Sequence, residues 1–259
     1  LANTACSKLE RLSIVRRTAE RGDYTQVAPT YDLSDKGRKA APAMAEQLLA
    51  AATQFYQAGQ LQQAEQQAQR ALKAKAPAGD VHTLLALIAS ASGDSGGAGS
   101  HYEQALAVAP GNGSYANNYG TWLCESGRAA ESLDWFDKAL ADPAYSTRTA
   151  ALANAGICAA KAGQKIRAEA NWRQALAFDP VVTPALSGMA RLQYEKGSYL
   201  DARGFVERWL ALAPDDANAL QLAAQIEQKL GDNAAAQRYL SRMQANPPTP
   251  GTTTPPRTQ

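Results

Sequence analysis

Three cysteines, Cys6, Cys124 and Cys158, could do chemistry, because a thiolate can bind a metal, act as a nucleophile or enter a disulfide. No two of them stand in a Cys-x-x-Cys pair, the spacing typical of structural zinc, so no metal site is predicted. A catalytic thiol needs a histidine within reach as its base, and the sequence indicates none. Neither a cofactor nor a catalytic cysteine is therefore expected.

A glycine-rich run also contains a serine that could act as a nucleophile. Gly93-Asp94-Ser95-Gly96-Gly97 resembles the segment that carries the nucleophile of chymotrypsin-like serine proteases. Those proteases are β-barrels, whereas no strand pattern surrounds this run, and His82 and His101 fall on predicted helices. Gly93 also belongs to the repeat pattern described next, so the run is predicted to be a turn between helices. No enzymatic activity is expected.

Composition and charge exclude further classes of protein. Apolar residues make up 45% of the 259 residues and aromatic residues only 7%, which favours closely packed helices over a β-sandwich or barrel. The net charge of +2 is too small and scattered for a nucleic-acid partner. No phosphate-binding Gly-x-x-x-x-Gly-Lys loop occurs, and no small-molecule substrate is predicted. No run of 18 apolar residues is present that would span a bilayer.

The glycines reveal an internal period, with spacings of 34, 34, 36, 34 and 34 residues. They are Gly59, Gly93, Gly127, Gly163, Gly197 and Gly231. Five residues after each stands a small residue that would let two helices cross closely: Ala64, Ala98, Ser132, Ala168, Ala202 and Ala236. A proline near the end of each unit would stop a helix: Pro77, Pro110, Pro143, Pro180, Pro214 and Pro247. Each unit is therefore predicted to be helix, glycine turn, helix and proline stop.

A helix-turn-helix unit of 34 residues resembles the tetratricopeptide repeat (TPR), and the runs 117–120 (Asn-Asn-Tyr-Gly) and 139–143 (Ala-Leu-Ala-Asp-Pro) match its pattern. The resemblance implies an all-α fold, a right-handed superhelix of six TPR repeats with a continuous core and a concave groove. The predicted repeats are 45–78, 79–112, 113–148, 149–182, 183–216 and 217–248.

The repeat pattern also predicts the core and the positions of the irregular segments. The expected core residues are Leu48, Phe55, Leu72, Leu85, Leu106, Tyr119, Leu123, Phe136, Leu140, Trp172, Leu176, Leu186, Met189, Leu210 and Leu240. The two extra residues of the third unit should form a loop around residues 145–149. Residues 7–44 are predicted to be a linker, and the Pro/Thr-rich residues 249–259 a disordered tail.

The first residues, Leu1-Ala2-Asn3-Thr4-Ala5-Cys6, resemble the end of a bacterial lipoprotein signal peptide. Ala5 is the small residue expected before the cleavage site, and the resemblance implies that Cys6 carries the lipid. The protein would then be lipid-anchored at the periplasmic face of the outer membrane. The alternative is a plain cysteine near a frayed terminus.

Cys124 and Cys158 fall on the first helices of two consecutive units. Adjacent helices make contact possible, and the two thiols could pair in an oxidising periplasm. The alternative is that both are small buried hydrophobic residues without a bond, because free cysteine commonly fills helical cores.

The concave groove is the predicted binding surface. Helical spacing assigns to it Tyr56, Leu87, Asn117, Thr121, Ile157 and Arg191, all on first helices of their units. A clamp for a peptide carboxylate is not expected, because Arg191 is the only charged residue in this set. For any single residue, the alternative is contact with solvent or with the next helix.

Repeats three to five contain further runs that match a known family: 117–120, 136–143, 154–158 and 199–203. Together these runs resemble the type IV pilus biogenesis lipoproteins of Gram-negative bacteria, the PilF/PilW-type pilotins. The resemblance implies a non-catalytic outer-membrane lipoprotein that binds the type IV pilus secretin and promotes its localisation and multimerisation. A general periplasmic TPR scaffold for another envelope assembly machine is the alternative.

Overall fold

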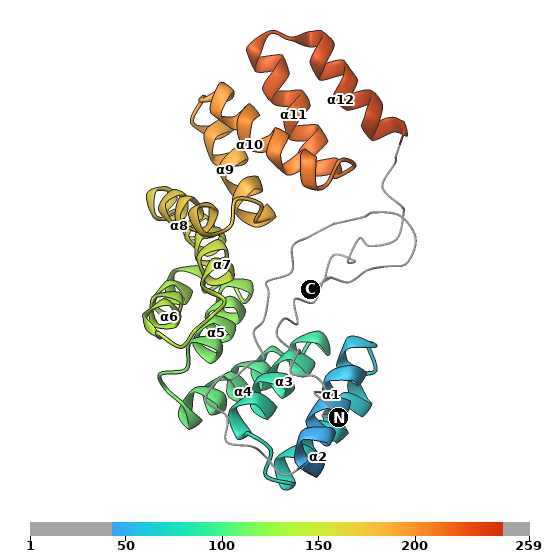
Figure 1. The fold of residues 1–259 in the computed structure, drawn as a ribbon, viewed down its shortest axis with the longest axis vertical. Coiled ribbons are helices and arrows are strands. Elements are labelled where there is room, and N and C mark those ends of the chain that lie inside the picture. The colour runs from blue at the N-terminus through green and yellow to red at the C-terminus, as the bar shows by residue number, and fades with distance from the viewer. Residues whose placement is uncertain (1–42, 246–259) are drawn as a thin grey trace, which may run out of the picture. The chain divides into compact units, whose positions relative to one another are not determined.

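The structure is a computed structural model that describes residues 43–245, and every regular element in this range is an α-helix (Figure 1). The predictions made for Cys6, for the tail 249–259 and for most of the linker 7–44 lie outside the described residues. The linker was predicted two residues too long, because a helix begins at Ala43. Contacts divide the described chain into two compact units. Unit 1 ends at Ala168 and unit 2 begins at Glu169, so the boundary falls inside a helix.

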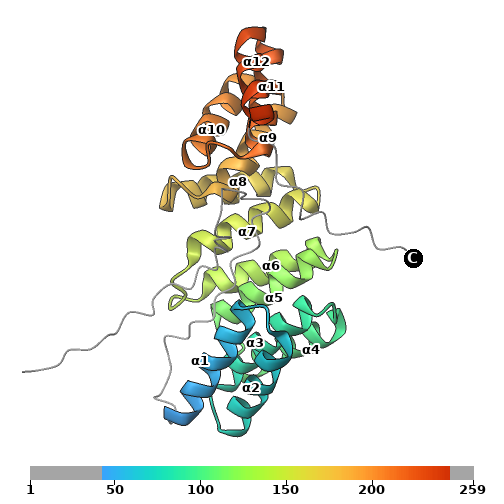
Figure 2. The ribbon, with the colours of Figure 1, turned by 90° about the vertical axis from the view of Figure 1, so that its right-hand side faces the viewer.

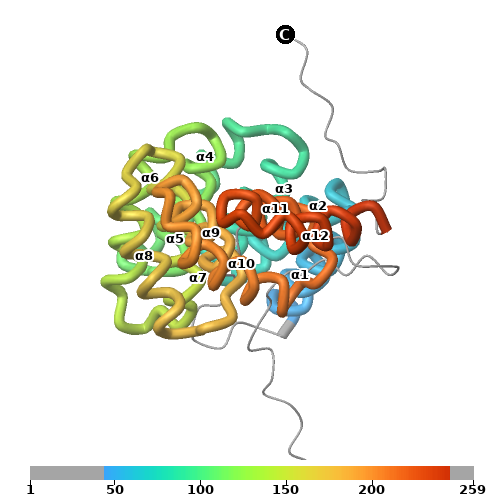
Figure 3. The backbone as a smooth tube through the Cα atoms, turned by 90° about the horizontal axis from the view of Figure 1, so that it is seen from above, coloured from blue at the N-terminus to red at the C-terminus, as the bar shows by residue number. Residues whose placement is uncertain are grey.

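Consecutive helices pair as hairpins, as Figure 2 shows from the side. Unit 1 holds α1 (Ala43–Gln57), α2 (Leu61–Lys73), α3 (Ala78–Ala91), α4 (Ser95–Val108), α5 (Gly113–Glu125), α6 (Ala129–Ala141) and α7 (Arg148–Lys161). Helix α8 (Lys165–Phe178) contains the boundary. Unit 2 continues with α9 (Thr183–Glu195), α10 (Tyr199–Leu212), α11 (Ala217–Leu230) and α12 (Asn233–Ala245), the last two side by side (Figure 3). The predicted all-α repeat fold is confirmed.

The periodic glycines form the turns inside the hairpins. All six have φ between 74° and 84°, in the left-handed region that favours glycine because a side chain there is strained. At Gly93 the backbone closes the end of α3, since the Gly93 amide donates to the Ser90 carbonyl and the Asp94 amide to the Ala89 carbonyl. The glycine period therefore marks the positions where the chain reverses direction.

The buried core lies where the helices pack against one another. The small residues that follow the glycines, Ala64, Ala98, Ser132, Ala168, Ala202 and Ala236, are all buried. Of the predicted core, these are buried: Leu85, Leu106, Tyr119, Leu123, Phe136, Trp172, Leu186, Met189 and Leu210. The remaining predicted core residues are half-buried: Leu48, Phe55, Leu72, Leu140, Leu176 and Leu240. The half-buried residues border the core rather than filling its centre.

Glycines also let aromatic rings approach neighbouring helices closely in unit 1. A Cβ added to Gly79 on α3 would lie 2.4 Å from the ring of Tyr115 on α5. A Cβ added to Gly99 on α4 would lie 2.5 Å from the ring of Trp122, which is also on α5. Contacts this short do not occur between real atoms, so these two rings occupy the space that a side chain would need.

The loop between α6 and α7 ends two residues earlier than predicted, because Arg148 and Thr149 already belong to α7. Tyr145 in this loop is buried. Asp142 holds the loop, because its carboxylate accepts hydrogen bonds from the amide of Ala144 at 2.9 Å and from the amide of Gly113 at 2.8 Å. The insertion is therefore an ordered connection that packs on the start of α5.

Candidate protein-binding surface

The glycine-rich run around Ser95 spans the end of the turn after α3 and the start of α4. Asp94 caps α4, where its carboxylate accepts the Gly97 amide at 2.8 Å, and Ser95 is exposed as the first residue of that helix. The turn predicted for the whole run is limited to Gly93 and Asp94, because Ser95, Gly96 and Gly97 already belong to α4. Within residues 43–245 no group of three or more His, Cys, Asp or Glu side chains could hold a metal ion. No helix in the same range is long and apolar enough to cross a membrane.

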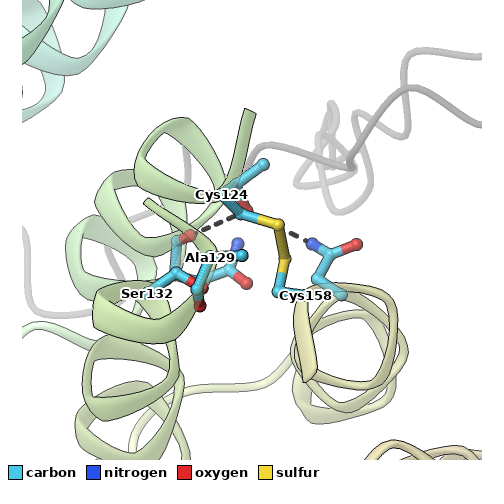
Figure 4. Close-up of a disulfide and its surroundings, with 7 residues drawn as sticks. Cys124, Ala129, Ser132 and Cys158 are labelled. Carbon is cyan, nitrogen blue, oxygen red and sulfur yellow. Dashed lines mark hydrogen bonds between the residues drawn. A yellow bond between two sulfur atoms is a disulfide. The ribbon is translucent and has the colours of Figure 1, made fainter. Parts of the chain in front are cut away.

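Cys124 on α5 and Cys158 on α7 are joined by a disulfide (Figure 4). Their Cα atoms lie 5.7 Å apart, within the usual range for bonded cysteines, and both side chains are buried. Beside the bond, Ser132 on α6 donates to the Ala129 carbonyl at 2.6 Å. Of the two possibilities left open by the sequence, the structure contains the bonded one, which links the third repeat to the fourth.

Three residues assigned to the groove cannot contact a partner. Leu87 on α3 is 2% exposed, and Asn117 and Thr121 on α5 are 0% and 1% exposed, so this part of the prediction is wrong. In unit 1 helix α5 contacts α3 on one side and α7 on the other. The small side chains along these helices let the helices approach until the middle of the inner face is closed.

Buried polar groups fill this closed part of the inner face. Thr121 donates to the Asn117 carbonyl at 2.9 Å and accepts from the Asn154 amide on α7 at 3.5 Å. At the other end of α5, the Tyr115 hydroxyl donates to the Asp80 carboxylate on α3 at 2.9 Å. These side chains satisfy one another between repeats, which is the usual condition for burying polar groups. They hold the repeats together rather than bind a partner.

The inner face of unit 1 is open near the ends of its first helices. Tyr56 near the end of α1, Ser90 near the end of α3 and Ile157 near the end of α7 are half-buried, and Ala160 on α7 is exposed. We call Tyr56, Ser90, Ile157 and Ala160 the open rim. The open rim is a small surface that is largely apolar and carries no charge. A partner can reach it without any movement of the helices.

The inner face of unit 2 is more open and more polar. Arg191 on α9 is exposed, as the sequence predicted, and Tyr194 one turn later is half-buried. Helix α11 turns the amides of Gln221, Gln225 and Gln228 to the same side, and all three are at least partly exposed. This surface offers one positive charge and several amide groups, so it suits hydrogen bonding more than apolar contact.

An ionic cluster fixes the first two helices of unit 2. Glu169 on α8 accepts hydrogen bonds from Lys196 on α9, from Arg173 at 2.7 Å and from Gln193 at 3.2 Å. The bond from Lys196, followed by that from Arg173, lowers the pKa of Glu169 from an ordinary 4.5 to about 2. Glu169 is therefore ionised at any physiological pH.

Two features of the surface were not predicted from the sequence. Phe178 and Leu212 are exposed at the ends of α8 and α10, and Val181 is exposed beside Phe178. The sequence does contain a signal for the exposed apolar residues. Phe178 and Leu212 each stand two positions before a proline that stops the helix, Pro180 or Pro214. The other feature is a contact between His82 and His101, which the sequence placed on helices but did not bring together.

Comparisons with known proteins agree with this architecture. A tetratricopeptide repeat family model matches residues 49–112 and 83–147. The type IV pilus assembly protein PilF of Pseudomonas aeruginosa is 25% identical over 185 residues, which make up 71% of this chain and 73% of PilF.

Two solved structures resemble the whole repeat array. PilW, described as a widely conserved type IV pilus biogenesis factor, is 33% identical with a TM-score of 0.73, over 80% of this chain and 94% of PilW. The structure of P. aeruginosa PilF gives the same TM-score of 0.73 at 23% identity, over 79% of this chain and 92% of PilF. The similarity thus extends over most of each relative.

Proposed function

Because the chain belongs to the PilW/PilF family of type IV pilus biogenesis TPR proteins, we propose that it is a non-catalytic assembly factor that binds the pilus secretin. Binding would promote the localisation and multimerisation of the secretin in the outer membrane, and hence pilus biogenesis. The observation that carries the proposal is the similarity to PilW, at 33% identity over 94% of its length. Such coverage leaves little of PilW without a counterpart here.

The architecture supports a binding role. In each unit, buried core residues and short turns fix the helices before any partner arrives. A preformed surface loses little conformational entropy on binding, so a modest contact area can give useful affinity. The open rim supplies apolar contact, and the amides of α11 can hydrogen-bond to a polypeptide backbone.

We place the secretin contact at the open rim of unit 1. Ile157 and Tyr56 offer apolar surface there, and the four rim residues carry no charge that would demand a charged ligand. A short, uncharged segment of the secretin fits this chemistry. Leu87, Asn117 and Thr121 are excluded as contacts by their burial.

We also propose that Cys6 is acylated and anchors the protein at the periplasmic face of the outer membrane. Several acyl chains on one cysteine bind a bilayer stably, whereas one chain binds only marginally. The Cys6→Ser variant should move to the soluble periplasmic fraction. If that variant stays in the outer membrane, and the unchanged protein incorporates no palmitate, the anchor proposal is wrong.

The test of the secretin proposal is a pull-down from envelope extracts with the purified full chain, combined with deletion of its gene. The secretin should be enriched on the bait, and its heat-resistant multimers should disappear in the deletion strain and return on complementation. Normal multimers in the deletion strain would contradict the proposal. Enrichment of a different envelope protein in their presence would favour a scaffold for another assembly machine.

A further inference from the structure

The chain contains only two histidines, and the structure brings them together in the second repeat. The Nδ1 atoms of His82 on α3 and His101 on α4 lie 3.4 Å apart. The ring centroids are 5.5 Å apart, so the rings turn their Nδ1 edges toward each other. Both side chains are half-buried.

The repeat pattern does not require either histidine. The position of His82 carries an apolar residue in each of the other five repeats: Leu48, Ala116, Leu152, Leu186 and Leu220. Four of these five are buried core residues, and Leu48 is half-buried. The position of His101 carries Gln67, Trp135, Asn171, Phe205 and Tyr239. His82 therefore departs from an apolar position, and it contacts His101, which lies at a variable position of the same hairpin.

We infer that His82 and His101 form a binding site for a divalent transition-metal ion such as Zn²⁺. Two nitrogen ligands at about 2.1 Å from a tetrahedral metal ion are about 3.4 Å apart. This spacing matches the observed Nδ1 to Nδ1 distance of 3.4 Å. Imidazole suits zinc, copper and nickel, whereas magnesium and calcium prefer oxygen ligands.

The surroundings favour a bound cation. Burial lowers the pKa of both His82 and His101, which favours the neutral imidazole that binds metal ions. The carboxylates of Glu65 on α2 and Asp94 at the start of α4 act on His101 in the opposite direction, since their negative charge raises its pKa. The same negative charge would attract a metal ion. Because the site offers two protein ligands, water would complete the coordination, and the ion would exchange readily.

Metal binding would move a proton within the histidine pair, while the number of protons that the pair carries stays the same. When both rings are neutral, a proton on one Nδ1 can be donated to the other Nδ1. To bind the metal through both Nδ1 atoms, each ring must carry its proton on Nε2. One ring therefore changes tautomer, and no proton is released.

Zinc titration of the full chain by isothermal calorimetry tests this inference, with Cys6 alkylated, any affinity tag removed and Mg²⁺ as the control ion. The unchanged protein should bind one Zn²⁺ per chain and no Mg²⁺. The variants His82→Leu and His101→Gln introduce residues that other repeats carry at these positions, so they should keep the helical fold. Each should weaken zinc binding at least tenfold.

Chemical shifts of the histidine ring nitrogens give a second readout. Zinc should move the Nδ1 resonances of both rings, whereas the exposed Gln104→Ala variant on α4 should behave as the unchanged protein does. No saturable zinc binding by the unchanged chain would overturn the inference. Equal zinc binding by both folded histidine variants would overturn it as well.

Discussion

Cys124 and Cys158 are separated by 34 residues and bonded to each other, so the disulfide joins corresponding helices of two consecutive repeats. Neighbouring repeats otherwise meet through packing, hydrogen bonds and ion pairs such as that between Lys196 and Glu169. A covalent link at this point limits how far the third and fourth repeats can separate when the protein unfolds.

The disulfide should therefore stabilise unit 1 substantially. Closing a loop of this length restricts the unfolded chain, and such links contribute roughly 2 to 4 kcal/mol. We expect the Cys124→Ser, Cys158→Ser double variant to lose about this much free energy of unfolding, measured by urea denaturation. Adding a reductant should lower the stability of the unchanged protein but not that of the double variant. Equal free energies of unfolding for the unchanged protein and the double variant, both without reductant, would show that the bond contributes nothing.

Replacing Ile157 by glutamate should weaken secretin binding without unfolding the protein. The change places a charge on the open rim, whose apolar contact would lose about 1 to 3 kcal/mol, or roughly 5- to 150-fold in affinity. Ile166→Glu on α8 is the matched control, because Ile166 is 89% exposed and lies outside the rim. Capture of the secretin should fall for Ile157→Glu only, while circular dichroism shows equal helix content. If both variants capture the secretin normally, the contact lies elsewhere.

The stability of unit 2 should decrease in acid because of Glu169. Its folded-state pKa of about 2 lies below the ordinary 4.5, so its ionised form is stabilised by folding. This contribution is fully present above about pH 5.5 and is lost as the pH falls from there to about 2. Thermal melts across this range should show a steeper loss for the unchanged protein than for Glu169→Gln. Parallel curves would mean that the ion pairs with Lys196 and Arg173 do not contribute to stability.

Two glycines in the helices of unit 2 should respond to alanine in opposite ways. A Cβ at Gly188 on α9 would lie 2.4 Å from the buried ring of Trp172, so Gly188→Ala should destabilise by about 1 to 3 kcal/mol. Gly204 on α10 has no neighbouring atom within 4 Å of such a Cβ. Gly204→Ala should therefore stabilise by about 0.5 to 1 kcal/mol. A destabilised Gly204→Ala, or an unchanged Gly188→Ala, in chemical denaturation would contradict the packing described.

The sequence predicted the hairpins well because their turns depend on local chemistry. A left-handed backbone at Gly93 or Gly197 favours glycine, so the recurrence of glycine with the repeat period locates the turns directly. Accessibility was harder to predict. Helical periodicity correctly placed Asn117 and Thr121 on the inner face, but it does not tell how closely α3 and α7 approach that face.

The exposure of the residues assigned to the groove was therefore predicted in part. The same reasoning that failed for the buried Leu87 gave an exposed Arg191, because in unit 2 the inner face is more open. The contact between His82 and His101 depends on how α3 packs against α4 within their hairpin. A list of residues on one helix face does not contain that information.

Gly79 and Gly99 give the second and third repeats a fixed order. Tyr115 and Trp122 of the third repeat occupy the space left by these two glycines, so the surfaces form a matched pair. An extra repeat inserted between them during evolution would have to reproduce both partners at once. We expect this junction to be inherited as a single piece.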